Sequence, residues 1–204
     1  MDSAQVTVID DDCLVLRALD RLLRSAGFAV QTFSSAQDFL SQRTPGVPGC
    51  VVMDLSMPGF SGLELQHALA EADDCRPVVF ISGNGSVPSS VEAMKAGAVD
   101  FLTKPLDEEK FLHAVRAALE KDRVARERGA ERASIIARIA TLTVRERQVL
   151  AHVVAGKLNK QIAAALGTAE KTVKVHRARM MRKMAVNSLA ELVREWTVNQ
   201  PPQL

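Results

Sequence analysis

The chain has 204 residues, 47% of them hydrophobic, and a formal net charge of +2 at pH 7. No apolar run approaches the roughly 18–20 residues of a membrane-spanning helix, and no basic-then-apolar leader is present. We therefore expect a cytoplasmic protein without membrane contact, built as one large domain or two small ones.

Five short apolar runs rich in Val, Ile and Phe occur in the first half of the chain. They cover residues 5–9, 29–33, 50–54, 77–81 and 98–102. The runs are continuous, as in strands buried on both faces. Helical patterns lie between and after them at residues 12–26, 35–42, 62–72, 87–96 and 106–120. This alternation predicts a doubly wound α/β fold with a five-stranded parallel sheet.

Polar residues follow four of these runs. Asp10, Asp11 and Asp12 follow the first run, Asp54 ends the third, Ser82 follows the fourth and Lys104 follows the fifth. Ligands of such sheets bind outside the carboxyl ends of the strands. A hard cation such as Mg²⁺ would neutralise the clustered carboxylates, and a lysine would hold an anion. The pattern therefore indicates a site that receives a phosphoryl group.

The three cysteines, Cys13, Cys50 and Cys75, show no CxxC spacing. An odd number without metal-binding spacing predicts reduced, mostly buried thiols. We assign them no function.

The charge is divided unevenly along the chain. Residues 1–120 carry 9 Lys+Arg and 17 Asp+Glu, a formal charge of −8, whereas residues 121–204 carry 17 and 7, a formal charge of +10. Such asymmetry indicates a nucleic-acid or acidic partner for the basic part, although a solvated surface is the alternative.

The basic part carries the signals of a helix-turn-helix. "TVRE" (143–146) and "SLAE" (188–191) have the spacing of capping boxes, and Gly156 and Gly167 mark helix ends. The expected helices cover residues 143–155, 159–166, 170–183 and 188–198. Two helices joined by a tight glycine turn are typical of DNA-binding helix-turn-helix motifs.

The helix expected at 170–183 is strongly basic. Its cations are Lys171, Lys174, His176, Arg177, Arg179, Arg182 and Lys183. Its apolar positions, Val173, Met180 and Met181, have helical spacing, so we expect them to face a core. A helix with this pattern is a candidate reader of the DNA major groove.

Residues 121–139 predict a charged helical extension interrupted by Gly129. It has two interpretations, a solvated linker or a hinge that sets the distance between domains. The expected domains are residues 1–120 and 140–200, with this linker between them.

Four motifs of the first part occur in the order and at the spacing of one known family. They are "DDD" (10–12), "MDLSMPGFSGLEL" (53–65), "ISGNG" (81–85) and "AMKAGAVDFLTKP" (93–105). They resemble the receiver domain of two-component response regulators. The resemblance implies that Asp54 accepts a phosphoryl group from a sensor histidine kinase. It also implies Mg²⁺ held by Asp10, Asp11, Asp54 and the Ser56 carbonyl.

The same resemblance assigns further roles in this region. It implies that Ser82 bonds the phosphoryl group, Phe101 is the switching aromatic and Lys104 binds the anion. The Lys104–Pro105 bond is expected to be cis. Asp12 is expected to cap the first helix instead of binding the metal.

Residues 142–193 are similar to the LuxR/FixJ-type helix-turn-helix, so the chain as a whole resembles a FixJ/NarL-type transcriptional regulator. The resemblance implies DNA contacts from Lys160, Lys171, Thr172, Lys174, His176, Arg177 and Lys183. Two positions depart from the family pattern, because Ala169 stands where Ser is usual and Met184 where Leu is usual. The first predicts a weaker cap, at a cost of about 1 kcal/mol.

The resemblance also implies a homodimer after phosphorylation. Our candidate dimer residues are Val91, Met94 and Lys95 in the first domain and Leu189, Leu192 and Val193 in the second. The expected partners are a sensor histidine kinase and double-stranded DNA, with RNA polymerase as a further candidate.

Three other functions agree less well with the sequence. An orphan regulator that ignores phosphate would be expected to lack one member of the Asp10, Asp11, Asp54, Ser82 and Lys104 set. A Mg²⁺ phosphohydrolase would need a second catalytic acid, and Asp54–Leu55–Ser56 lacks the DxD arrangement. A structural adaptor does not explain a domain of charge +10. We therefore expect a regulator and not an enzyme.

Overall fold

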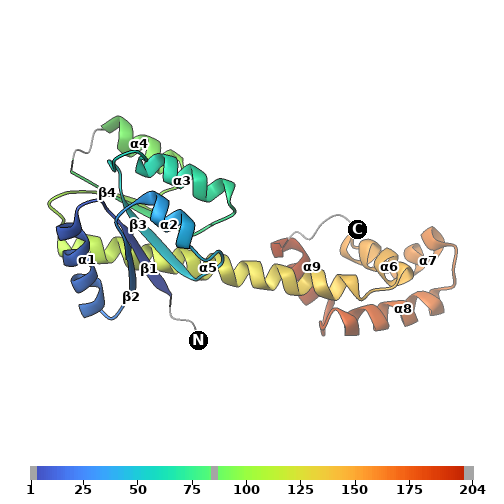
Figure 1. Ribbon diagram of the computed structural model, residues 1–204. Helices are drawn as coiled ribbons and strands as arrows, with labels where there is room; N and C mark the ends of the chain where they lie inside the picture. The colour runs from blue at the N-terminus through green and yellow to red at the C-terminus, as the bar shows by residue number, and fades with distance from the viewer. Residues whose placement is uncertain (1–3, 84–86, 200–204) are drawn as a thin grey trace. The chain divides into compact units, whose positions relative to one another are not determined.

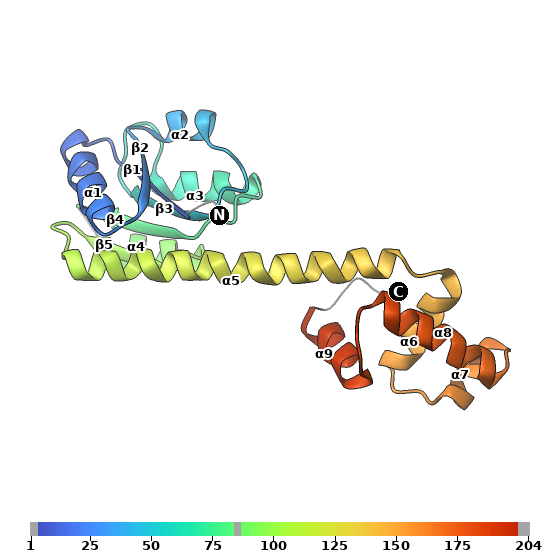
Figure 2. The ribbon, with the colours of Figure 1, turned by 90° about the horizontal axis from the view of Figure 1, so that it is seen from below.

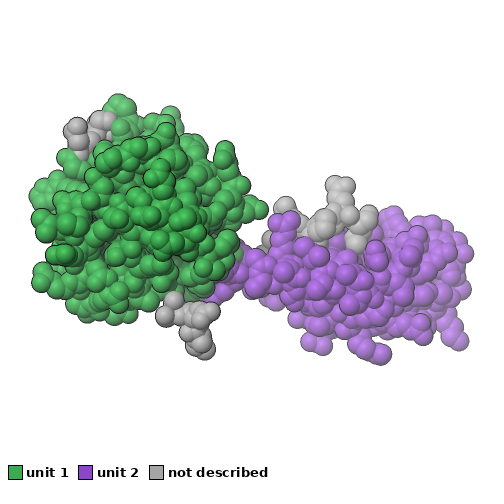
Figure 3. Space-filling view, viewed as in Figure 1, with its two compact units in different colours: residues 1–125 green, residues 126–204 purple. Residues whose placement is uncertain are grey.

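The computed structural model describes residues 4–83 and 87–199. The chain divides into two compact units, Met1–Ala125 and Arg126–Leu204, which Figure 3 colours separately. Within the described residues, no helix combines the length and the apolar character needed to cross a membrane.

The first unit is built on one parallel sheet of five strands. The strands are β1 (Gln5–Ile9), β2 (Ala29–Phe33), β3 (Gly49–Asp54), β4 (Val78–Ser82) and β5 (Asp100–Thr103). Their spatial order is β2-β1-β3-β4-β5. The chain therefore reverses its direction of travel across the sheet between β1 and β3, which is where ligands of doubly wound sheets bind. The predicted fold of this part is confirmed.

Helices cover both faces of this sheet (Figures 1 and 2). The helices α1 (Cys13–Ser25) and α5 (Glu108–Ala140) lie on one face, and α2 (Ala36–Gln42), α3 (Gly62–Glu71) and α4 (Val87–Lys95) lie on the other. Strand β3 shows why its sequence is continuously apolar. Val52 packs in the cluster with α1 and α5, whereas Val51 and Met53 pack in the cluster on the opposite face.

Helix α5 is longer than the sequence predicted. It runs from Glu108 to Ala140 without a break at Gly129, so the expected interruption is wrong. One glycine costs a helix only about 1 kcal/mol, and the neighbouring Ala, Arg and Glu residues are strong helix formers. Within the first unit, the buried Asp122 carboxylate accepts a hydrogen bond of 2.9 Å from the Gly49 N–H and so fastens α5 to the start of β3.

The second unit is helical. It contains α6 (Val144–Val154), α7 (Asn159–Leu166), α8 (Glu170–Lys183), α9 (Leu189–Asn199) and the end of α5. Its core includes Ile135 from α5 together with Leu150, Ile162, Val173 and Met180. Gly167 ends α7 in the left-handed conformation at φ 63°, which lets the chain turn at once into α8.

Side chains cap some of these helices as predicted. Thr143 and Glu146 form a complete capping box at the start of α6. Before α9, the Ser188 hydroxyl accepts a hydrogen bond from the Glu191 N–H, but the Glu191 carboxylate accepts from Asn187 and not from Ser188. That second box is therefore only half formed. Ala169 gives α8 no side-chain cap, as its sequence implied.

The cysteines correct one prediction. Cys13 and Cys75 are exposed, and only Cys50 is buried. Cys13 opens α1 on its solvent side, and Cys75 lies in the loop before β4. Neither position faces a core, which explains why the expectation of mostly buried thiols fails.

Candidate functional site

The ends of the strands bring the predicted polar residues together. Ile9 pairs with Met53 across β1 and β3, so the next residues, Asp10 and Asp54, leave adjacent strand ends. Ser82 pairs with Thr103 across β4 and β5, which places Lys104 one residue beyond Ser82 at the same edge. Parallel strands thus deliver residues far apart in the sequence to one pocket.

Lys104 links the two buried acids of this pocket. Its Nζ atom lies 2.7 Å from Oδ2 of Asp10 and 3.1 Å from Oδ1 of Asp54. The side chains of Asp10 and Asp54 are almost wholly buried, whereas that of Lys104 is partly exposed. One ammonium therefore serves two carboxylates that have little access to water.

The protonation equilibria reflect this crowding. Burial raises the pKa of Asp10 above its usual value, although hydrogen bonds from Lys104 and from the Asp12 N–H oppose the shift. For Lys104, burial disfavours the charge, but hydrogen bonds to Asp10 and Asp54 outweigh that effect and raise its pKa. The pocket therefore keeps its ammonium charged while one of its acids is under electrostatic strain.

The remaining acids of the trio are arranged differently. Asp11 and Asp12 are exposed. The Asp12 carboxylate accepts a hydrogen bond of 2.8 Å from the Leu14 N–H and caps α1, as predicted. The Ser56 N–H donates a hydrogen bond of 3.0 Å to Oδ2 of Asp54, which holds that carboxylate from the β3 side.

The donor atoms of the pocket suit a hard divalent cation. Within the described residues, Oδ1 of Asp54 is buried and has no hydrogen bond beyond its ion pair with Lys104. The neighbouring ligands would also be oxygens, which Mg²⁺ prefers. Among the described residues, no group of three or more His, Cys, Asp or Glu side chains is arranged so that it could hold a metal ion. The exposed Asp11 is not held by packing and is the acid that could complete the set.

The other predicted residues of this unit lie around the pocket. Ser82 is fully buried, and its carbonyl accepts a hydrogen bond of 2.8 Å from the Lys104 N–H. The half-buried Phe101 ring packs 6.4 Å, centroid to centroid, from that of the fully buried Phe80. The Lys104–Pro105 bond is cis, as expected.

One residue at this site was not singled out from the sequence. A Cβ atom on Gly62, the first residue of α3, would lie only 2.5 Å from the carbonyl oxygen of Asp54. The helix can therefore approach the strand end only because this position lacks a side chain. The spacing of Gly62 from Asp54 is visible in the sequence, but the close approach is not.

The predicted DNA-binding residues lie mainly on the outer side of the second unit. Lys171, Thr172 and Lys174 on α8 are exposed, as is Lys160 on α7. Lys174 forms an exposed ion pair with Glu170 at 3.3 Å. Such a pair contributes little to stability, so the Lys174 ammonium is available to another anion.

Three further predicted contacts are partly engaged within the unit. His176 and Arg177 are half-buried, and Arg177 donates a hydrogen bond of 3.2 Å to the side chain of Asn159. Lys183 lies 2.7 Å from the buried carboxylate of Glu146 and donates to the Thr141 carbonyl at 3.0 Å. Lys183 thus has a role inside the unit, and its contact with DNA stays a prediction.

The exposed face of α8 contains residues that the sequence interpretation did not assign to DNA. They are Val175, Ala178, Arg179 and Arg182. These positions follow Lys171 at intervals of three and four residues, which is the spacing of one helix face. They therefore share the outer face of α8 with Lys171.

The dimer candidates divide into exposed and buried residues. On α4, Val91 and Met94 are 45% and 47% exposed, and on α9, Leu189 and Val193 are 40% and 37% exposed. Lys95 is exposed as well. Leu192, in contrast, is fully buried in the core of the second unit, so its assignment to a dimer surface is corrected. In a helix, only one side of the Leu189–Val193 turn can face outward.

Two family models match the chain. Residues 6–116 match the response regulator receiver domain, and residues 140–196 match the bacterial regulatory proteins of the luxR family. The first match contains the pocket of Asp10, Asp54 and Lys104, and the second contains α8.

Relatives match over nearly the whole chain. The response regulator protein TodT of Pseudomonas putida is 46% identical over 93% of this chain and 83% of its own length. The transcriptional regulatory protein FixJ of Azorhizobium caulinodans is 46% identical over 95% of this chain and 92% of its own. The solved structure of the response regulator StyR has a TM-score of 0.85 and 46% identity, and the match covers 96% of this chain and 98% of StyR.

Proposed function

The chain belongs to the transcriptional response regulators that join a receiver domain to a LuxR-type DNA-binding domain, and from this membership we propose that Asp54 is its phosphoacceptor. In the proposed reaction, the P–N bond of a sensor kinase's phosphohistidine breaks while a carboxylate oxygen of Asp54 bonds to phosphorus, giving an acyl phosphate. The observation that carries the proposal is the Lys104 ammonium, 2.7 Å from Asp10 and 3.1 Å from Asp54.

We propose that the pocket binds Mg²⁺, as the resemblance to receiver domains implies. In this chain we assign the ligands to Asp10, Asp11, Asp54 and the Ser56 carbonyl. When bound, the ion supplies positive charge that neutralises the carboxylates and the phosphoryl oxygens. Lys104 is the second positive group, and it would pair with a phosphoryl oxygen next to Asp54. The Ser56 N–H holds the Asp54 carboxylate in place.

The response to phosphorylation would pass through two neighbouring residues. The Ser82 hydroxyl would bond the phosphoryl group, and the Phe101 ring, which is only half-buried, would turn inward. Because Phe101 lies on β5, this movement would alter the surface of α4 and β5. Val91, Met94 and Lys95 are the residues through which we expect two receivers to dimerise in the cytoplasm.

In the second unit, α8 is the proposed DNA-reading helix. Lys171, Thr172 and Lys174 at its start would reach base edges of the major groove, with His176 beside them. Lys160, Arg177 and Lys183 would lie nearer the phosphates. A dimer would place two such helices on half-sites about one helical turn apart. Leu189 and Val193 are the exposed candidates for contacts between the two DNA-binding units, and RNA polymerase is a further candidate partner at the promoter.

Phosphorylation of the full chain by acetyl phosphate and Mg²⁺ tests this function. We would compare the wild type with Asp54→Asn and with the control Asp73→Asn, which changes an exposed acid outside the pocket. The measurements are intact mass, oligomeric size by light scattering, and retention of a duplex selected from random DNA by the wild-type chain. Wild type and the control should gain one phosphoryl group, dimerise and bind DNA more tightly, whereas Asp54→Asn should do none of these.

Three outcomes would contradict different parts of the proposal. A mass gain by Asp54→Asn would show that another residue is the phosphoacceptor. Equal DNA binding by phosphorylated wild type and Asp54→Asn would favour the orphan regulator, in which DNA binding ignores the receiver's chemistry. Binding that did not weaken with salt would count against a basic helix as the reader.

A further inference from the structure

The C-terminal end of α8 is tied to the segment between α5 and α6 and to the first turn of α6. Lys183, the last residue of α8, bonds the Thr141 carbonyl and the buried Glu146 carboxylate. Met184, which follows it, is 1% exposed and packs in the core of the unit. Contacts with residues that follow α5 therefore hold the C-terminal end of α8 in place.

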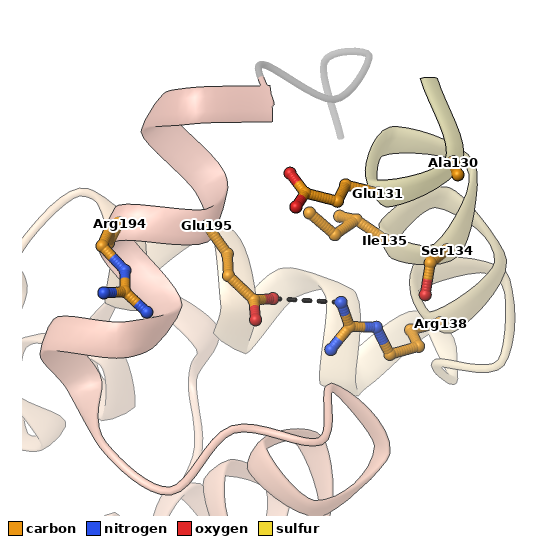
Figure 4. Close-up of a pocket in the computed structure, with 7 residues that line it drawn as sticks. All are labelled: Ala130, Glu131, Ser134, Ile135, Arg138, Arg194 and Glu195. Carbon is orange, nitrogen blue, oxygen red and sulfur yellow. Dashed lines mark ion pairs between the residues drawn. The ribbon is translucent and has the colours of Figure 1, made fainter. Parts of the chain in front are cut away.

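Arg138 on the last turns of α5 makes the other tie. Its Nη1 donates a hydrogen bond to the Met184 carbonyl, and its Nη2 lies 3.1 Å from Oε2 of Glu195 on α9. The side chain is 24% exposed, so most of it is packed. Figure 4 shows the pair facing each other across the cleft between α5 and α9, with the ion pair dashed. One guanidinium thus joins three helices.

The physical effect of this contact follows from helix geometry. The last carbonyls of a helix lack partners within the helix and carry partial negative charge. Arg138 satisfies the Met184 carbonyl, at the C-cap of α8, with a positive group. At the other end of α8, Ala169 provides no side-chain cap. The C-terminal end of α8 is therefore held by side-chain hydrogen bonds, whereas its start has no side-chain cap.

Arg138 lies outside the segment that matches the luxR family model, which begins at residue 140. The structure nevertheless includes this part of α5 in the second unit, because Ile135 is 2% exposed in its core. We propose that Arg138 is a positioning residue for DNA binding, which fixes the end of α8 to α5 so that the cations of α8 meet the groove in one orientation. The proposal rests on the proposed function only in taking α8 as the DNA-reading helix.

The test uses the full-length chain with Arg138→Ala, Arg138→Lys and two controls. Arg132→Ala removes the same charge from an exposed position of the same helix. Val149→Ala opens a cavity in the core of the second unit without touching the end of α8. Two measurements are made on each variant: amide hydrogen exchange at residues 181–186, and affinity for both the duplex selected by the wild type and an unrelated duplex at several salt concentrations.

The proposal predicts a specific pattern. Arg138→Ala should exchange faster than either control at residues 181–186 and should lose about tenfold or more in affinity for the selected duplex, as expected when a hydrogen bond from a charged group is removed. Its affinity for the unrelated duplex and the salt slope should match those of the wild type, because the cations of α8 are unchanged. Arg138→Lys should lie between the two, since a lysine keeps the charge but lacks the two-pronged guanidinium.

Three results would overturn the proposal. They are unchanged exchange at residues 181–186, unchanged affinity for the selected duplex, or an equal loss for both duplexes that Val149→Ala reproduces. The last result would mean that only general stability had changed. A wild-type chain that prefers no duplex would instead count against the proposed function, and hydrogen exchange would then decide alone whether Arg138 anchors α8.

Discussion

Each unit contains a buried carboxylate in contact with a lysine at the same distance, but the pKa values of the two acids are shifted in opposite directions. Lys104 lies 2.7 Å from Asp10 in the first unit, and Lys183 lies 2.7 Å from Glu146 in the second. The pKa of Asp10 is raised by burial, whereas the pKa of Glu146 is lowered, chiefly by its hydrogen bond from Lys183. Contact distance alone therefore does not show whether the environment of a buried acid favours its charged form.

The balance between burial and hydrogen bonding explains the difference: burial is the largest influence on the pKa of Asp10, whereas hydrogen bonds from Lys183 and the Thr143 N–H outweigh burial at Glu146. Asp10 shares its lysine with a second buried carboxylate, Asp54. Glu146 has Lys183 and also accepts a hydrogen bond of 2.8 Å from the Thr143 N–H. The acid with the raised pKa lies beside Asp54, the proposed phosphoacceptor, and the acid with the lowered pKa joins α6 to the end of α8. This contrast agrees with the general tendency of perturbed groups to gather at functional sites.

The largest effect that would sharpen this comparison is expected from Glu146→Ala. The change removes the partner of Lys183 and half of the capping box, so it should lower the free energy of unfolding by about 2–3 kcal/mol. Urea unfolding of the chain would measure it. Glu170→Ala, which removes only the exposed pair with Lys174, should change stability by less than about 0.5 kcal/mol. Equal effects of the two changes would remove the distinction.

Asp10→Asn should act in the opposite direction. Because ionisation of an acid with a raised pKa opposes folding, its removal should raise the free energy of unfolding at neutral pH, while Mg²⁺-dependent phosphorylation of Asp54 should weaken. Asp74→Asn is the matched control in the same unit, since Asp74 is buried, lies 2.6 Å from Arg76 and has a lowered pKa despite its burial. That variant should be destabilised. A loss of stability in Asp10→Asn would contradict our account of the pocket.

Lowering the pH should reduce the difference in stability between the wild type and variants that lack the charge of Glu146 or of Asp10. The lowered pKa of Glu146 means that its charge stabilises the fold above the usual value of 4.5 and that this contribution is lost as the pH falls through the lowered value. The deficit of Glu146→Gln should therefore shrink below pH 4.5. The raised pKa of Asp10 means that its ionisation destabilises the fold as the pH rises through the raised value. Below its usual value of 3.8, the advantage of Asp10→Asn should disappear. Urea unfolding across the acid range measures both differences. A difference in the free energy of unfolding that does not change with pH would contradict the pKa shift assigned to that residue.

The smallest effect is expected from Ala169→Ser. A serine at this position can cap α8 and should stabilise the chain by roughly 0.5–1 kcal/mol. Thr143→Ala, which removes an existing cap from α6, is the control and should destabilise the chain by a similar amount. An unchanged midpoint of unfolding in Ala169→Ser would mean that the start of α8 is already satisfied in another way.

Much of the fold could be predicted because its signals are local. The continuous apolar runs predicted β1 and β2 at their observed bounds, and the glycine turn and periodicity did the same for α7 and α8. The pocket could be predicted because strand ends of a parallel sheet share one edge. Its residues lie far apart in sequence, but the rule of the fold brings them together.

What the sequence could not predict depends on contacts between distant residues. The pair of Lys183 with Glu146 joins residues 37 apart, and the bond from Arg138 to Met184 joins residues 46 apart. No spacing rule of a single helix indicates either contact. The same reason explains Leu192, because only the packing of α9 decides which side of that helix is buried. The continuity of α5 through Gly129 reflects neighbours whose summed helix propensity outweighs one glycine.

The central claim, that Asp54 is the residue that accepts the phosphoryl group, is tested most directly by a crystal structure of the chain grown with Mg²⁺ and beryllium fluoride. Our account predicts density for a beryllium fluoride group whose beryllium is bonded to a carboxylate oxygen of Asp54, a cation in contact with Asp10, Asp11, Asp54 and the Ser56 carbonyl, and Lys104 paired with a fluorine atom. An empty pocket at saturating concentrations, or the group attached to a different residue, would contradict it.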